Sequence, residues 1–124
     1  MKILKFGGKS LANEGIEKVI DIIITSHKEP LSVVVSARGN TTDELEALLE
    51  KASRGEDYTA DFQHLKNEQQ YDSRVSFEPE FQLLEKLLEG VSLLKDYSPK
   101  TKDLVLAQGE LMSAKLVAAL LKRK

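Results

Sequence analysis

The 124-residue sequence contains no cysteine and no tryptophan, and it has only three prolines. The absence of cysteine excludes disulfides, thiolate catalysis and metal sites with cysteine ligands. The formal net charge is −2, so no excess of one sign indicates a nucleic-acid or membrane-surface partner. Uninterrupted apolar runs are shorter than a membrane span, and an apolar strand pattern begins almost directly after Met1, which leaves no room for a signal peptide. We therefore expect a cytoplasmic protein.

The composition is otherwise that of an ordinary globular domain. Hydrophobic residues make up 41% of the chain and charged residues 31%, which is typical of soluble proteins. A chain of this length forms at most one domain.

The first ten residues carry the strongest functional signal. Residues 2–6 (KILKF) have the alternating pattern of a strand, and Gly7 and Gly8 follow directly. Glycines let a ligand approach main-chain N–H groups closely, and a strand, a glycine loop and a following helix N-terminus form a typical anion site. Lys5 and Lys9 add cationic side chains. We predict phosphate or carboxylate binding here; the alternative is an ordinary glycine turn with solvated lysines.

The triplet Gly8-Lys9-Ser10 also resembles the end of a Walker A loop. That motif requires a second glycine five residues before the glycine of the GK pair. Ile3 occupies this position, inside the predicted strand. A P-loop is therefore excluded.

The next stretch predicts a strand–helix–strand unit. Apolar residues recur at the spacing of one buried helix stripe, after Asn13 as N-cap, at Ile16, Val19, Ile20 and Ile23. Residues 31–36 (LSVVVS) are apolar and β-branched in succession, which is typical of a parallel strand buried on both faces. The two strands should therefore pair in parallel.

A second loop of small residues, 36–40 (SARGN), follows the second predicted strand. Thr41 and Glu44 have the spacing of a capping box, for a helix that ends near Gly55. Ligands of open α/β folds bind beyond the carboxyl ends of parallel strands. Because both loops lie at that edge, we expect them to converge on one crevice.

The remainder is predicted to be helical. Tyr58, Phe62 and Leu65 form a weak helical stripe. A second helix presents a narrow apolar seam formed by Phe77, Phe81, Leu84, Leu88 and Val91. His64 has no companion at metal-ligand spacing, so we expect a surface histidine and no metal site.

The last helix should begin at Ser98-Pro99, with serine as the cap and proline in the first turn. Gly109 and Glu110 interrupt its pattern. A glycine inside a helix is unfavourable, so Gly109 indicates close approach by another group. Glu110 either faces a cationic group, such as a substrate amine, or is an exposed helix glutamate.

No strand is predicted after Ser36, and two strands alone leave two open sheet edges. The helical pattern continues without a cap to Lys124, with apolar Leu116, Leu120 and Leu121 near its end. We therefore interpret residues 1–124 as the first part of a larger α/β domain. Open edges and an apolar helix end predict self-association as a homodimer or larger species.

Three segments carry a family resemblance. Residues 5–10 (KFGGKS) resemble the aspartokinase signature KFGGTS, with Lys9 in place of threonine. Residues 34–43 (VVSARGNTTD) resemble the second loop of that family, and residues 109–114 (GELMSA) are similar to its GExxSA segment. Residues 93–101 resemble, more weakly, the corresponding region of bifunctional aspartokinase–homoserine dehydrogenases. The segments occur in the family's order and cover nearly the whole chain.

The resemblance implies a partial amino-acid-kinase fold, which is an incomplete three-layer αβα sandwich with a βαβ start and a helix-rich remainder. It also implies transfer of the γ-phosphoryl group of MgATP to the side-chain carboxylate of L-aspartate. The magnesium ion would be bound mainly through ATP. Because the second half of the family's catalytic domain holds the nucleotide pocket, residues 1–124 alone are expected to be inactive.

The resemblance also implies roles for individual residues. Lys5 would be catalytic, by neutralising charge on the transferred phosphoryl group. The phosphates would be bound by Lys5, Gly7, Gly8, Lys9 and Ser10, and L-aspartate by Ser36, Thr42 and Glu110, with Glu110 on its α-ammonium group. Two alternatives remain: an enzyme of the same superfamily that acts on another small acid, and a non-catalytic interaction module whose glycine loops are ordinary turns.

Overall fold

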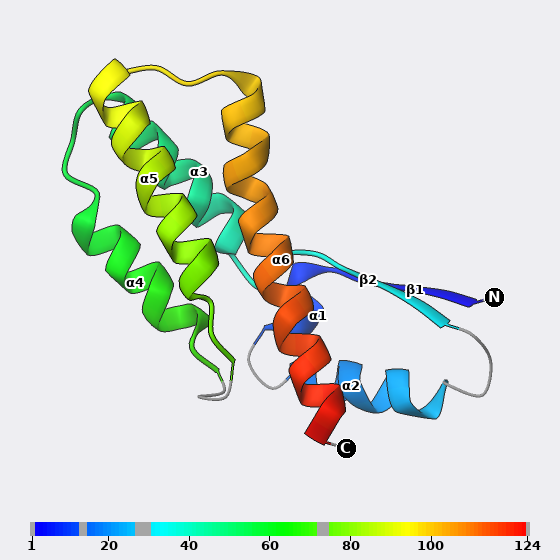
Figure 1. Ribbon diagram of the computed structural model, residues 1–124. Helices are drawn as coiled ribbons and strands as arrows, with labels where there is room; N and C mark the ends of the chain where they lie inside the picture. The colour runs from blue at the N-terminus through cyan, green and yellow to red at the C-terminus, as the bar shows by residue number, and fades with distance from the viewer. Residues whose placement is uncertain (1, 13–14, 27–30, 72–74, 124) are drawn as a thin grey trace.

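The computed structural model describes residues 2–12, 15–26, 31–71 and 75–123 (Figure 1). Two strands and six helices occur in these ranges, in the order β1 (Lys2–Phe6), α1 (Gly8–Leu11), α2 (Gly15–Thr25), β2 (Leu31–Val35), α3 (Thr41–Ser53), α4 (Thr59–Gln69), α5 (Glu78–Leu94) and α6 (Pro99–Arg123). Within the described residues no strand follows β2, as predicted. The α/β fold with a helix-rich remainder is confirmed.

β1 and β2 form a two-stranded parallel sheet, as the strand–helix–strand pattern predicts. The register pairs Lys2 with Leu31 and Phe6 with Val35. Just beyond the strands, the Ser36 N–H donates a hydrogen bond of 3.1 Å to the Phe6 carbonyl. The two loops that follow the strands therefore start side by side.

Only one face of this sheet is covered by described residues. Leu4 and Phe6 of β1 pack against the core together with Val33 and Val35 of β2. On the opposite face, Ile3 is 58% exposed and Val34 is 49% exposed. The prediction that residues 31–36 are buried on both faces is therefore wrong, because the described helices pack against one side of the sheet only.

The predicted helical stripes are confirmed. Ile16, Val19, Ile20 and Ile23 of α2 are buried, while the predicted N-cap Asn13 lies outside the described residues. The seam that begins at Phe77 is buried along α5, and the Phe81 ring contacts the rings of Phe62 and Phe77 edge-on. Figure 1 shows α3, α4, α5 and the first half of α6 lying together away from the sheet.

The predicted helix ends are partly confirmed. Ser98 caps α6, because its Oγ accepts a hydrogen bond of 3.1 Å from the Thr101 N–H, and Pro99 is the first helical residue. The capping box at Thr41 is wrong, because α3 already includes Thr41 and its hydroxyl accepts a hydrogen bond from Gln69 instead. The four-residue helix α1, directly after Gly7, was not predicted.

α6 is continuous from Pro99 to Arg123, so the predicted interruption at Gly109 and Glu110 is wrong. By length and composition, its residues Pro99–Lys122 could cross a membrane. One side of the helix is in the protein core, however, and the helix contacts α2, α3, α5 and β2. Leu116 and Leu120 are fully buried and Leu121 is half-buried. The prediction of an exposed apolar end on this helix is therefore wrong.

Candidate functional site

The two loops that follow the strands meet directly, as predicted. The Gly39 N–H donates a hydrogen bond of 2.8 Å to the Gly8 carbonyl. A Cβ at Gly8 would collide with the Ala37 carbonyl oxygen and would lie 3.2 Å from the Gly39 carbonyl oxygen. Gly39 itself has a φ of +53°, a conformation that favours glycine. Glycine is therefore required at Gly8 and favoured at Gly39 for the two loops to make this contact.

Residues 109–114 lie in α6, and Gly109 among them packs against the second loop where the two loops meet. A Cβ at Gly109 would lie 2.9 Å from the Cβ of Ala37, 3.2 Å from Leu45 Cδ1 and 3.3 Å from Thr41 Cγ2. The close approach predicted for Gly109 is thus present, and the approaching group is the second loop with the start of α3. We call the place where Gly8, Ala37, Gly39 and Gly109 meet the loop junction.

The candidate site residues lie around the loop junction. Gly8 is half-buried. The other candidate residues are exposed to solvent: Lys5, Gly7, Lys9, Ser10, Ser36, Thr42 and Glu110. Nothing lies within 4 Å of a Cβ placed at Gly7, so the main chain of the first loop is open to a ligand at this point. The exposed polar groups come from all three segments.

The first loop differs from the predicted anion site in one respect. α1 begins at Gly8 and has only four residues. Because a helix dipole results from many aligned peptide units, so short a helix contributes little to anion binding. Attraction of an anion at this loop would depend on Lys5, Lys9 and the exposed main chain at Gly7.

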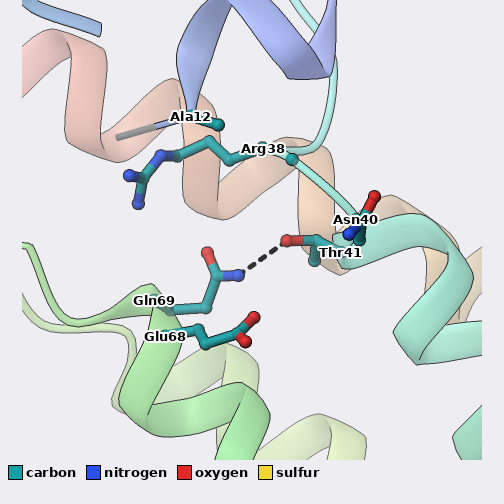
Figure 2. A pocket seen from close by; sticks show the side chains of 7 residues that line it. Ala12, Arg38, Asn40, Thr41, Glu68 and Gln69 are labelled. Carbon is teal, nitrogen blue, oxygen red and sulfur yellow. Dashed lines mark hydrogen bonds between the residues drawn. The ribbon is translucent and has the colours of Figure 1, made fainter. Parts of the chain in front are cut away.

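A hollow of about 400 Å³ adjoins the second loop (Figure 2). It is lined by residues 38–41 together with Ala12, Glu68 and Gln69. The Gln69 Nε2 donates a hydrogen bond of 2.8 Å to Thr41 Oγ1, and both side chains are buried. We call this hollow the Arg38 pocket.

Arg38 is a residue whose role the sequence did not reveal. Its Nε donates a hydrogen bond of 3.0 Å to the Leu11 carbonyl, and its guanidinium lies over the Tyr71 ring, 5.3 Å from the centroid. Only 9% of the residue is exposed. Burial lowers the pKa of the Arg38 guanidinium, and Tyr71 opposes this shift. An arginine within a loop of small residues was the available signal.

His64 is exposed, as predicted, but it does have carboxylate neighbours. Its Nε2 lies 2.6 Å from Glu68 Oε1, and one ligand atom each of Glu44, His64 and Glu68 lies within 4.8 Å of the others. The prediction that His64 lacks companions at metal-ligand spacing is therefore wrong. Burial raises the pKa of Glu44 to about 7, helped by a hydrogen bond and charge repulsion from Glu68 and opposed by His64.

The whole chain, residues 1–124, matches the family model for the amino acid kinase family. The chain belongs to this family. Among curated proteins of known sequence, it is 32% identical over 130 residues to aspartokinase 1 (chloroplastic) and 29% identical over 132 residues to aspartokinase 2 (chloroplastic), both from Arabidopsis thaliana. These matches cover 96% and 98% of this chain but 23% and 24% of the relatives.

Solved structures of this family give the same result. The chain matches E. coli aspartokinase III in complex with aspartate and ADP with a TM-score of 0.83 and 27% identity. It matches the same enzyme in complex with lysine and aspartate with a TM-score of 0.70 and 28% identity. Both matches cover 98% of this chain and 29% of the other. The resemblance to aspartokinases and the partial amino-acid-kinase fold are confirmed, and the chain spans about a quarter of the length of its curated relatives.

Proposed function

We propose that this chain forms the aspartate- and phosphate-contacting part of an aspartokinase, which transfers the γ-phosphoryl group of MgATP to the side-chain carboxylate of L-aspartate. The observation that carries the proposal is the loop junction. Three segments far apart in the sequence meet there through contacts that need glycine at Gly8 and Gly109. The aspartokinase III structure that this chain matches is a complex with aspartate and ADP.

The first loop would bind the phosphates. In the proposed step a carboxylate oxygen of aspartate attacks the γ-phosphorus, the bond to the β–γ bridging oxygen breaks, and ADP leaves. Such a transfer depends on positioning and on stabilising negative charge. Lys5 is the catalytic cation, and Gly7, Gly8 and Ser10 offer N–H and hydroxyl donors. The magnesium ion, which would arrive bound to ATP, would offset further phosphate charge.

Lys9 replaces the threonine of the family signature. Its side chain is exposed beside the first loop, where an ammonium group can reach a phosphate oxygen. We therefore assign Lys9 to phosphate binding as well. A lysine provides a mobile point charge where a threonine would provide one hydroxyl donor.

Ser36, Thr42 and Glu110 would bind L-aspartate. Ser36 begins the second loop, Thr42 lies in the first turn of α3, and Glu110 follows the glycine that packs on Ala37. An exposed carboxylate at this position suits the α-ammonium group of an amino-acid substrate. An enzyme acting on a simple acid without an amine would not require Glu110, so this residue separates the two possibilities.

We further propose that residues 1–124, when isolated from the rest of the catalytic domain, associate with another copy through the uncovered sheet face. Ile3 and Val34 present apolar area on this face, and a two-stranded sheet has open edges that favour pairing with another copy. A cytoplasmic location stays a prediction.

A chimera tests the proposed activity. Residues 1–124 would replace the matching segment of E. coli aspartokinase III, and aspartyl phosphate would be trapped with hydroxylamine while ADP release is measured. We expect the chimera to be active and the 124-residue chain alone to be inactive. A folded chimera that releases no ADP with aspartate, or that prefers another small acid, contradicts the proposal. Activity of residues 1–124 alone would show that the rest of the family's catalytic domain is dispensable.

A further inference from the structure

Arg38 carries a buried positive charge that has no acidic partner among the described residues. Among the residues that the structure describes, no carboxylate forms an ion pair with it. Its Nε donates a hydrogen bond to the Leu11 carbonyl, and the plane of its guanidinium lies over the Tyr71 ring. A buried charge without a counter-ion is strongly unfavourable. The remaining donors of Arg38 are therefore suited to an anionic ligand.

The terminal nitrogens of Arg38 face the pocket. Figure 2 shows the guanidinium reaching from the second loop over the open space, with Gln69 and Glu68 of α4 on the opposite wall. Thr41 and Gln69 also line the pocket, and a hydrogen bond between the Gln69 amide and the Thr41 hydroxyl fixes both side chains. The pocket thus has a fixed cationic wall. Guanidinium groups bind carboxylates with two parallel hydrogen bonds.

The other wall is acidic. Glu68 lines the pocket, and it is held in place by His64. Glu44 places a second carboxyl group beside Glu68, because one oxygen of each lies within 4.8 Å of the other and of a His64 ring nitrogen. A positively charged group on a ligand would be attracted by these neighbouring carboxyl groups. A ligand with two negative ends would be repelled by this wall, whereas one with a negative and a positive end fits both walls.

We propose that the Arg38 pocket binds a free α-amino acid, with its carboxylate on Arg38 and its ammonium group on Glu68. The volume of about 400 Å³ lies in the range of small-molecule pockets. The pocket is separate from the proposed aspartate position. Thr41 is buried in its wall, whereas Thr42 is exposed, and successive helix residues point about 100° apart. Both positions adjoin the second loop and the first turn of α3.

Isothermal titration of the purified protein tests this inference. Glycine and L-glutamine would serve as zwitterionic probes, and acetate and inorganic phosphate as probes with a negative charge only. We expect the two amino acids to bind, and Arg38→Gln to weaken them about tenfold or more, because a charge-assisted, bidentate contact is lost. Arg54→Gln is the matched control, since Arg54 is exposed and pairs with Glu50 and Glu56.

Glu68→Gln provides a second variant that does not disturb the link to Leu11. It should weaken both amino acids and leave phosphate unchanged or improved. Circular dichroism would establish whether each variant is folded. If Arg38→Gln is not folded, Arg38→Lys would be measured in its place. Arg38→Lys keeps the charge but loses the two-pronged contact, so it should also weaken the amino acids.

Three results would overturn the inference. The first is unchanged amino-acid binding in the Glu68→Gln and Arg38 variants. The second is binding of phosphate or acetate only, or of no probe at tens of millimolar. The third is loss of amino-acid binding in Glu110→Gln, because binding would then occur at the proposed aspartate position. A failure of the proposed kinase activity would leave these titrations unaffected.

Discussion

Lys5 lies at the end of β1, exposed, two residues before the first glycine of the loop. Replacement by alanine should lower kcat of the chimera by about a hundredfold or more, because a lysine on the phosphoryl group acts mainly where charge develops in the transition state. Steady-state kinetics with aspartate and ATP would measure this. Lys18→Ala on α2 is the control, and a Lys5→Ala chimera with most of its turnover would contradict the assignment.

Glu110 makes a different prediction, because it is assigned to binding. Glu110→Gln keeps the size of the side chain and removes the charge that would hold the α-ammonium group. The KM for aspartate should rise about tenfold or more, while the KM for ATP should stay near its original value. Glu89→Gln on the exposed side of α5 is the control. Unchanged KM and kcat for aspartate would be incompatible with the role.

The raised pKa of Glu44 makes the stability of the folded protein depend on pH. This pKa is raised to about 7 by burial and by Glu68, against an ordinary value of 4.5. A folded-state pKa above the unfolded value means that the folded protein binds the proton more tightly. This contribution to stability is fully present below about pH 4.5 and is lost as the pH rises to about 7.

The prediction is therefore a fall in stability across this pH window that the Glu44→Gln variant lacks. Urea unfolding between pH 4.5 and 7.5 would measure the free energy of unfolding of both proteins. Glu85→Gln is a suitable control, because this glutamate is exposed on α5. Parallel curves for the original protein and Glu44→Gln would contradict the raised pKa.

Among the elements, those with long periodic patterns were predicted well. The apolar stripes of α2 and α5 recur every three or four residues, and this spacing alone determines which face is buried. α1 was missed because four residues hold no periodic signal. Thr41 was assigned to a cap because its partner Gln69, 28 positions away, cannot be inferred from local spacing. Likewise, whether residues 31–36 are covered on one face or two depends on what packs against them.

Two glycines in helices give a contrasting pair of mutations. Gly90 in α5 has nothing within 4 Å of an added Cβ, so Gly90→Ala should stabilise the protein by up to about 1 kcal/mol through helix propensity. Gly109→Ala gains the same propensity, but its Cβ would lie 2.9 Å from the Cβ of Ala37. We expect this variant to be destabilised, since the second loop must shift. Thermal unfolding of both would be compared, and equal stabilisation would contradict the close contact.

For the whole molecule, the uncovered sheet face predicts association. The chain should form a dimer or larger species at micromolar concentration, and Val34→Lys should shift it to a monomer, because a charge is unfavourable on a buried apolar surface. Light scattering would measure the mass of both. Leu93→Lys is the control for exposed apolar area elsewhere, since Leu93 is 85% exposed at the end of α5. An original protein that is monomeric throughout would contradict the prediction.

The candidate site as a whole was predictable to the extent that its parts are consecutive in sequence. The glycines of the first loop, the small residues 36–40 and Gly109 each indicated a close approach. Their meeting at one point depends on α6 returning to the sheet, which no local pattern specifies. The Arg38 pocket was not predictable at all, because α4 supplies one of its walls from nearly thirty residues further along the chain.

The contacts at the loop junction restrict how this part of the protein can change over time. Ala37 touches the positions of both Gly8 and Gly109, so three segments share one small volume. An added methyl group on any of them must be accommodated by the other two. Substitutions here should accordingly arise in compensating sets, with a larger side chain at one position accompanied by a smaller one at its neighbour. The sequences of the three motifs would then change together during evolution, although the motifs are separated by up to about a hundred residues.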